Sequence, residues 1–355
     1  MKRWWLMVSV AACWSAAGLV CGQGTPPAGV SASWMPVESD AGVPPAVDEI
    51  YAKGCRYLAD NQDERGRWAG GGRHGPGADA ALATLVWLAS GEDPVFGPYA
   101  GNVKRGVRVL IEQQDAASGI YGSRGGQSSM YVHGFAMLAV AEAYGAIDED
   151  DLGADRSLGR SLELAVGGAV KSQKKNRYGG WRYGANATDA DTSVAGAVMM
   201  GLLAARNAGV AVPDEAVDRG VAYFESMTGD SGTVAYSGMG GMGQSLARSS
   251  IANLVYAVSR RRELPQHAAT TNYLTDNLMP AATSYVAYTR YYRAQALFQS
   301  DIDAWATWNR ELVDRLVEEQ RDDGRFRGDL GQPVDTALTL LALALNYRFL
   351  PIYER

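Results

Sequence analysis

The sequence predicts an all-α protein with the fold of an (α/α)6 toroid, a barrel of six inner helices within six outer helices. Two observations lead to this prediction: a short phrase returns along the chain, and two kinds of helix alternate. The phrase is clearest as KGCRYLADNQDERGRW at 53–68, and it returns at 105–121, 173–181, 219–234 and 316–326. The position of its Gln falls at 62, 114, 173, 228, 278 and 320, which are 42 to 59 residues apart. A period near fifty residues with two helices in each unit indicates a helical repeat protein.

The first helix of each unit is predicted to be amphipathic and the second to be apolar on all sides. In 47–62 the apolar residues follow i, i+3, i+4, i+7 spacing, and 307–320 is built in the same way. The second helices at 78–89, 192–205 and 336–347 have little polar surface, so they must be buried on both faces. Six helices with one buried face, arranged around six helices that are buried on both faces, give a closed toroid. An open solenoid has the same local pattern, but its units would not be expected to stop at six.

The recurring phrase is predicted to brace neighbouring units, which is a structural role. A helix that ends leaves carbonyl groups without partners, and the next helix begins with unpaired amides. A Gln side chain donates to one set and accepts from the other, and a Gly lets the chain turn so that an aromatic residue returns to the Gln. The residues assigned to this role are Gln62 and Trp68, Gln114 and Tyr121, Gln173 and Trp181, and Gln320 and Phe326.

The amino terminus is predicted to direct export. Basic residues precede an apolar run from Trp4 to Val20, which is followed by Cys21 and Gly22, the order found in secretory signals. We therefore expect a signal peptide over 1–22, a flexible linker over 23–44 and a single toroid domain over 45–355. The mature protein is expected in the periplasm or outside the cell. A retained membrane anchor, or lipidation of Cys21, is the alternative.

Composition argues against several classes of partner. The chain has 355 residues, of which 47% are apolar and 20% charged, as in ordinary globular proteins. Its formal net charge is −6 and it has no basic block, which argues against a nucleic-acid partner. We expect no stable membrane span once the signal is cleaved. Cys55 is the only cysteine of the toroid, so we expect no internal disulfide and no metal site, and no cofactor is indicated.

The phrase Lys53-Gly54-x-x-Tyr57-Leu58-x-x-x-Gln62-x-x-x-Gly66-x-Trp68 resembles the QW repeat of the squalene/terpenoid cyclases. Those proteins share the α/α toroid with the β subunits of protein prenyltransferases. The stretches ADTSVAG, RYYRAQALF and WATWNREL are similar to exported bacterial members described as prenyltransferase/squalene-oxidase repeat proteins. The resemblance spans the mature chain. It implies a central cavity that takes an apolar or isoprenoid ligand, with or without residual cyclase or transferase chemistry.

The residues that carry chemistry in these families match less well. Class II cyclases protonate their substrate with the middle acid of an Asp-x-Asp-Asp-Thr motif, and this chain has Asp189-Ala190-Asp191-Thr192. Alignment of Asp191-Thr192 with that motif puts Ala190 at the position of the proton donor. Those cyclases use two helical domains, whereas this chain has length for one. The zinc site of the prenyltransferases is missing because Cys55 lies inside an outer helix. Whether the protein is an enzyme is left open.

The candidate catalytic residues are Asp189, Asp191 and His133. In such toroids reactive residues lie near the starts of the inner helices, where Asp189 and Asp191 fall. Crowded carboxylates raise each other's pKa and make a proton donor, whereas the alternative is that these residues are helix N-caps. His133 falls in the first turns of the second inner helix beside Tyr131, a candidate substrate contact. A base there would face the cavity, and a core histidine is the alternative.

Further candidate substrate-binding residues are two aspartates and a stripe of tyrosines. Asp79 and Asp335 fall near the starts of inner helices, with capping again as the alternative. Tyr285, Tyr288 and Tyr292 are predicted to share one face of an inner helix. There they would stack on a sugar or shield a carbocation through their π faces, unless they belong to the core.

Two other functions stay open at this point. Barrels of the (α/α)6 type also host carbohydrate-active lyases and hydrolases, so a glycan is the alternative small-molecule partner. A non-catalytic scaffold that binds a protein through its rim is the third hypothesis. A deep, dry aromatic pocket would favour a lipid, and an open groove with converging acids would favour a glycan.

Export is tested on the protein purified from its natural host. The mature chain should begin after Gly22 and lack Trp4 and Trp5, as measured by mass spectrometry of the intact protein. Deletion of residues 2–22 should leave the protein in the cytoplasm with an unchanged helical circular dichroism spectrum. A mature chain that keeps both tryptophans would indicate a retained anchor.

Overall fold

The computed structural model describes residues 43–69, 77–122, 129–149, 152–238, 245–279, 284–350 and 352. These residues belong to one compact unit, Val43–Arg355. The expected signal peptide and nearly all of the expected linker lie outside the described residues. Among the helices that are described, none is long and apolar enough to cross a membrane.

Helices of two kinds alternate along the described chain, and no strand occurs among them beyond isolated bridges. The outer helices are α1 (Pro45–Asp60), α3 (Ala100–Glu112), α5 (Leu158–Lys174), α7 (Asp214–Met227), α9 (Pro265–Asp276) and α11 (Ile302–Glu319). The inner helices are α2 (Ala78–Ala89), α4 (Ser129–Ala143), α6 (Thr192–Asn207), α8 (Leu246–Val258), α10 (Val286–Ser300) and α12 (Gln332–Leu343).

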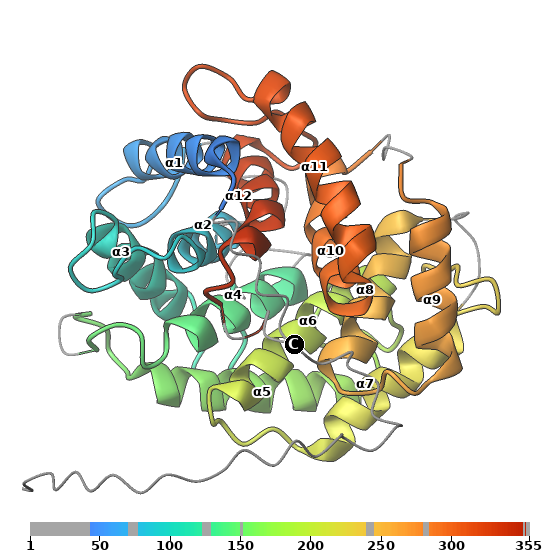
Figure 1. Ribbon diagram of the computed structural model, residues 1–355. Coiled ribbons are helices and arrows are strands. Elements are labelled where there is room, and N and C mark those ends of the chain that lie inside the picture. The colour runs from blue at the N-terminus through green and yellow to red at the C-terminus, as the bar shows by residue number, and fades with distance from the viewer. Residues whose placement is uncertain are drawn as a thin grey trace, which may run out of the picture. The chain divides into compact units, whose positions relative to one another are not determined.

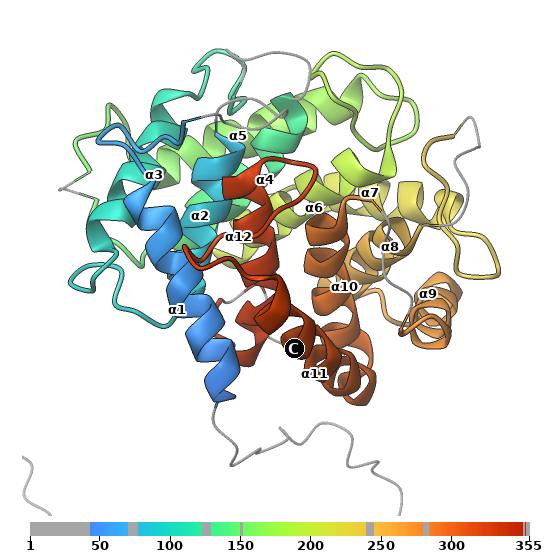
Figure 2. The same cartoon turned by 90° about the horizontal axis from the view of Figure 1, so that it is seen from above.

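The inner helices form a closed ring. Each packs against the next along the chain, and α12 packs against α2. The outer helices lie outside this ring; α3, for example, packs against both α2 and α4, and α11 packs against α1. Figures 1 and 2 both show the blue first helices beside the red last helix, so the two ends of the toroid meet. The predicted (α/α)6 toroid is confirmed.

Burial explains why the two kinds of helix have different sequences. In α6, residues such as Val194, Met199 and Leu203 are buried all round the helix, because it has neighbours on every side. In α1 only one stripe is buried, which includes Val47 and Leu58. Apolar side chains are therefore stabilising on every face of an inner helix and on one face of an outer helix.

Two predicted helices differ from the structure by more than two residues at an end. The amphipathic helix that was expected over 307–320 begins at Ile302, because the Asp301 side chain caps it by accepting from Ala304 N at 2.9 Å. The last inner helix was expected over 336–347. It spans Gln332–Leu343 and tightens into a 3₁₀ turn at Ala344–Asn346. Where these two helices begin and end depends on capping side chains and local turns, and hydrophobic periodicity carries no information about either.

The Gln side chains of the recurring phrase join neighbouring outer helices. Gln173 Nε2 donates to Gly179 O at 2.7 Å, in its own turn, and to Ala216 O at 2.8 Å, in α7. Gln320 Nε2 donates to Gly324 O at 3.0 Å and to Ile50 O at 2.9 Å, so the last outer helix is bonded to the first. Gln114 and Gln62 reach Ser161 O and Asn102 O of the next outer helix in the same way.

One detail of the predicted brace was different. The Gln oxygen was expected to accept from backbone amides at the start of the next helix. Instead Gln62 Oε1 accepts from Asn102 Nδ2 at 2.9 Å, and Gln114 Oε1 accepts from Ser161 Oγ at 2.8 Å. Asn102 and Ser161 lie in the first turns of α3 and α5, and there a side chain, not a backbone amide, is the donor to the Gln oxygen.

A glycine at each of these turns approaches the next outer helix closely. Gly119 has φ +77°, and a Cβ built there would lie 2.0 Å from Leu164 O. Gly324 has φ +89°, and its Cβ would lie 2.2 Å from Lys53 O. Both the backbone conformation and the space therefore require glycine. The same arrangement occurs at Gly66, Gly179 and Gly232.

The aromatic residues close the turns by contacts that differ with their chemistry. The indole nitrogens of Trp68 and Trp181 donate to Leu58 O and Ala169 O, each at 2.9 Å, near the end of their own outer helix. Tyr121 instead pairs its hydroxyl with Ser161 Oγ at 2.7 Å. Phe326 is buried, and its backbone amide donates to Thr336 Oγ1 at 2.9 Å.

The Gln joint is tested at Gln173, which is 1% exposed. Gln173→Met keeps the shape of the side chain and removes its donors, so the hydrogen bonds to Gly179 O and Ala216 O are lost in a buried setting. We expect the free energy of unfolding to fall by about 2–4 kcal/mol, as measured by urea denaturation. Gln332→Met, at an exposed Gln, is the control and should change it by less than about 0.5 kcal/mol. Equal effects of the two changes would contradict the joint.

Candidate functional site

The candidate site lies where the starts of several inner helices meet the loops that enter them. Met130 N at the start of α4 donates to Tyr183 O at 3.1 Å, and Thr192 N at the start of α6 donates to Tyr236 O at 3.0 Å. The loops that lead into α6 and α8 are thus bonded to the starts of α4 and α6, the inner helices before them. This brings residues far apart in the sequence to one end of the inner ring.

Asp191 is the buried carboxyl group of this site. It is the N-cap of α6, where its Oδ1 accepts from Ser193 N at 2.8 Å and from Val194 N at 3.0 Å. Its exposure is 0%, and among the described residues no donor is in hydrogen-bonding geometry with its Oδ2. One oxygen therefore caps the helix. The other forms no well-aligned hydrogen bond, and the carboxyl group also interacts with the hydroxyls of Tyr183 and Tyr236.

Four tyrosines surround this carboxyl group. They are Tyr131 on α4, Tyr183 and Tyr236 on the loops, and Tyr288 on α10, and all four keep part of their surface accessible. Burial is the main cause that raises the pKa of each hydroxyl, and the negative charge of Asp191 also contributes in every case. The four phenols are therefore neutral at physiological pH and are hydrogen-bond donors.

Contacts between the rings hold the group together. The hydroxyls of Tyr183 and Tyr236 are 2.6 Å apart, and the rings of Tyr131 and Tyr183 have centroids 6.2 Å apart. Tyr288 packs edge to face on Tyr292, with centroids 4.9 Å apart. The result is an aromatic wall beside the carboxyl group of Asp191.

A buried arginine completes the group. Arg248 is 7% exposed and donates from Nε to Val234 O at 2.9 Å. Burial lowers the pKa of its guanidinium group, while the charge of Asp191 acts in the opposite direction. Arg248, Tyr131 and Tyr288 are each the third residue of an inner helix, so they reach the same level of the ring.

Three of these residues were not found from the sequence. Tyr183 and Tyr236 lie in loops without periodicity, and Arg248 was not considered as a site residue, although it lies in the first turn of α8. The shared third position in an inner helix is a signal that would have pointed to Arg248, given correct helix starts.

Asp189 is separated from Asp191 by its own ion pair. Its Oδ2 lies 2.8 Å from Arg182 Nη1, and its side chain is 49% exposed. The predicted pair of interacting carboxyl groups is therefore not formed: Asp189 bonds to an arginine at the surface, and Asp191 caps a helix in the interior.

Asp79 and Asp335 tie loops to the first turns of α2 and α12. Neither is an N-cap, because Gly77 and Gly331 hold those positions. Asp79 Oδ1 accepts from Gly77 N at 3.2 Å, and Asp335 Oδ2 accepts from Leu330 N at 3.0 Å. Burial raises the pKa of Asp79, and raises that of Asp335 to about 6.

His133 lies between α4 and the outer layer. Its Nδ1 accepts from Tyr121 N at 3.2 Å, its ring centroid is 5.7 Å from that of Tyr121, and its exposure is 0%. Burial lowers its pKa to about 4. The structure does not bring His133 to Asp191, and its contacts are those of a neutral core histidine.

The expected face of three tyrosines contains only two. Tyr285 precedes α10 as its N-cap, with φ +49°, and is 50% exposed. Its backbone amide donates to Asp329 Oδ2 at 2.6 Å. Because α10 begins at Val286, Tyr285 lies outside the helix and cannot share a helical face with the other two tyrosines. Only Tyr288 and Tyr292 lie together on one face of α10.

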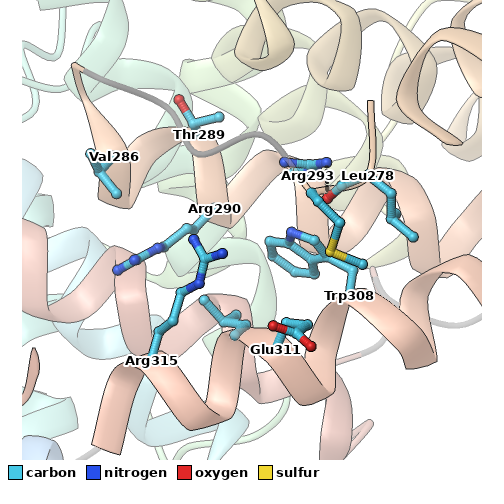
Figure 3. A pocket seen from close by; sticks show the side chains of 10 residues that line it. Leu278, Val286, Thr289, Arg290, Arg293, Trp308, Glu311 and Arg315 are labelled. Carbon is cyan, nitrogen blue, oxygen red and sulfur yellow. Dashed lines mark hydrogen bonds between the residues drawn. The ribbon is translucent and has the colours of Figure 1, made fainter. Parts of the chain in front are cut away.

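A small hollow between α10 and α11 is lined by three arginines (Figure 3). Its volume is about 40 Å³, room for a few water molecules. Arg290 forms two bonds of 2.7 and 2.8 Å with Glu319, and Arg293 lies over Trp308 at 5.6 Å and donates to Asn277 O and Leu278 O. These two guanidinium groups are held by the protein itself. In the described part of the chain, no three His, Cys, Asp or Glu residues gather as metal ligands would.

Several solved structures are similar to this chain. The type II terpene cyclase MstE_D109N from Scytonema, in complex with geranylgeranyl dihydroxybenzoate, has a TM-score of 0.59 at 16% identity, over 86% of this chain and 98% of that chain. MstE_R337A from Scytonema, with the same substrate, has a TM-score of 0.56 at 14% identity, over 86% and 98%. A protein from Actinoplanes has a TM-score of 0.58 at 16% identity, over 85% and 99%.

At these identities the likeness establishes the fold alone. No protein-family model and no curated protein matches the sequence. The expectation that class II cyclases need two helical domains does not hold for the MstE_D109N chain, because this single toroid covers 98% of it.

The burial of His133 makes a prediction about stability and pH. Its folded pKa of about 4 lies below the usual value of 6.5, so between these values the unfolded chain binds a proton that the folded protein does not. The contribution is fully present above pH 6.5 and is lost as the pH falls towards 4. Between pH 8 and pH 5 the loss from this group should be about 2 kcal/mol.

The measurement compares urea denaturation at pH 8 and pH 5 for the parent and for His133→Asn, which cannot titrate and keeps an acceptor. The fall in unfolding free energy should be about 2 kcal/mol larger in the parent. An equal fall in both proteins would mean that His133 titrates as a solvated residue.

Proposed function

We propose that this protein binds an isoprenoid ligand at the end of the inner ring where Asp191 lies, and that Asp191 transfers a proton to it. The reaction class is the acid-initiated cyclisation of a type II terpene cyclase. The observation that supports this most is the fully buried carboxyl group of Asp191, which caps α6 with Oδ1 and is surrounded by the hydroxyls and rings of four tyrosines. The toroid of MstE, which was solved with a geranylgeranyl substrate, adds support from the fold.

The two oxygens of Asp191 have different tasks in this proposal. Oδ1 already accepts from two backbone amides, so in this proposal Oδ2 is the oxygen that donates the proton. That proton adds to a terminal carbon–carbon double bond and leaves a carbocation. The next double bond attacks this cation, a ring bond forms, and the final cation loses a proton. The product is an isomer of the substrate, so no oxidant or reductant is required.

The tyrosines supply what a carbocation needs. Their neutral rings present π faces, which attract positive charge without reacting with it as a carboxylate would. The hydroxyls of Tyr183 and Tyr236 interact with the Asp191 carboxyl group, whose charge raises their pKa values. As donors they would stabilise the carboxylate that remains after proton transfer. Asp191 is 0% exposed, so the ligand must displace part of the surrounding protein to reach Oδ2.

The donor in this proposal is Asp191 and not the position that the motif alignment selects. Ala190 occupies that position and is buried beside the helix start. The dispersed acids also favour an isoprenoid over a glycan, because the described carboxyl groups do not converge on an open groove. Export of the protein, carried by residues 1–22, is part of the proposal and rests on the sequence.

The test is turnover of geranylgeraniol and of a geranylgeranyl-substituted hydroxybenzoate in D₂O. A cyclised isomer should carry one deuterium from the acid, detected by chromatography and mass spectrometry. Asp191→Asn keeps an acceptor for the N-cap and removes the proton donor, so we expect turnover to fall at least about 100-fold with unchanged thermal stability.

Asp189→Asn is the matched control. It removes a carboxylate two residues away that is held at the surface by Arg182, so turnover should change less than about fivefold. An Asp191→Asn protein that forms the deuterated isomer as fast as the parent would overturn the assignment of the acid. A parent that forms no isomer from either probe would overturn cyclisation of these substrates.

A further inference from the structure

A second, larger pocket opens at the surface beside the candidate site, and we call it the rim pocket. Its volume is about 330 Å³, the size of a small-molecule site. It lies between the turn after α5, the loop into α6 and the loop into α8. The residues that line it are Lys175, Arg177, Tyr178, Thr188, Asp189, Ala190, Ser237 and Gly238.

The rim pocket carries positive charge that the described protein does not neutralise. Lys175 donates to Asn186 Oδ1 and Arg177 donates to the Tyr178 hydroxyl, and both of these partners are uncharged. Among the described residues neither cation lies within ion-pair distance of a carboxylate. The one acid of the pocket, Asp189, is already paired with Arg182 at 2.8 Å. In a chain of net charge −6, this local excess of cations points to an anionic ligand.

The walls of the rim pocket are held in place before any ligand arrives. The Arg177 guanidinium lies over the Tyr178 ring, 4.7 Å from its centroid. Asn176 Nδ2 donates to Asp189 O, which fixes the loop that carries Thr188. Ser237 forms an isolated antiparallel bridge with Asp191, so the opposite wall is bonded to the start of α6. Preorganised walls lower the entropic cost of binding.

The chemistry of the lining defines the ligand. A guanidinium group and an ammonium group bind phosphate or carboxylate, Arg by two parallel hydrogen bonds and Lys as a point charge. The hydroxyls of Thr188 and Ser237 add neutral polar contacts. The volume exceeds what a bare oxyanion fills, so the rest of the ligand must be a polar body of about the size of a sugar. This differs from the small hollow of Figure 3, where Arg290 is neutralised by Glu319.

We propose that the rim pocket binds an anionic sugar, meaning a sugar phosphate or a sugar acid, through Lys175 and Arg177. This ligand is separate from the isoprenoid of the proposed function, and the pocket does not depend on the chemistry of Asp191. Such an anion comes either as a free monosaccharide or as part of an acidic glycan. The shared chemistry is the oxyanion next to a hydroxyl-bearing ring.

The test is isothermal titration calorimetry of the full protein at low salt with glucose 6-phosphate, glucuronate, inorganic phosphate and glucose. We expect glucose 6-phosphate and glucuronate to bind at least about tenfold more tightly than glucose, and the affinity to fall as salt is added. A glucuronate-containing tetrasaccharide, compared with glucuronate, distinguishes the sources. Tighter binding of the tetrasaccharide identifies a glycan, and equal binding identifies a free sugar.

Variants connect the binding to the pocket. Lys175→Gln and Arg177→Gln remove exposed cations, so both should fold as the parent does and bind glucose 6-phosphate about tenfold less tightly. Arg310→Gln is the control, because Arg310 is an exposed arginine of α11 that does not line the rim pocket, and this variant should bind as the parent does. Asp191→Asn should also bind as the parent does, which separates this site from the proposed acid.

Two results would overturn the proposal. One is the absence of binding of all three anions at concentrations up to about 10 mM in low salt. The other is binding whose affinity is unchanged in the Lys175→Gln/Arg177→Gln double variant.

Discussion

The structure depends on the contact between one outer helix and the next. At each of five turns a glycine with positive φ lies against the carbonyl of the following outer helix, and at four of the joints a Gln side chain adds hydrogen bonds across the same gap. The joint between α11 and α1 uses the same parts as the joints within the chain. Because of it the toroid is closed, and each inner helix packs against two other inner helices and against outer helices. Sequences as apolar as α2 and α12 are stable only under that condition.

Closure also builds the candidate site. The loops into α6 and α8 are bonded to the starts of α4 and α6, so side chains from neighbouring units gather at the same end of the ring. Asp191 comes from the third unit, Arg248 from the fourth and Tyr288 from the fifth. Three units together therefore determine the surroundings of the Asp191 carboxyl group. They supply the helix N-terminus that it caps, its aromatic neighbours and the side chains that bury it. The proposed proton transfer relies on this preorganisation.

The fold was predictable because it repeats. Six units with the same period made the Gln positions and the two kinds of helix visible, and Gln173 and Trp181 have contacts that follow from that pattern. Asp191 was found because the residue before an apolar helix is where a cap belongs.

The partner proposed for Asp191 was not correct, since the ion pair of Asp189 with Arg182 depends on the path of a loop. Tyr183, Tyr236 and the outward position of His133 depend on loop and ring geometry as well, and periodicity carries no information about these. Tyr285 shows how a helix start that differs by one residue moves a side chain out of a predicted face.

The claim that closure of the ring holds the fold together is tested most directly by comparing two glycines. Gly324→Ala strains the joint between the last and first outer helices, and Gly119→Ala strains a joint in the interior of the chain; their clearances of 2.2 and 2.0 Å are similar. The free energies of unfolding are measured by urea denaturation. A closed ring predicts equal losses, within about 1 kcal/mol, and a single transition for both variants. A small loss for Gly324→Ala beside a large one for Gly119→Ala, with the first and last units unfolding separately, would contradict closure and describe a linear array of repeats.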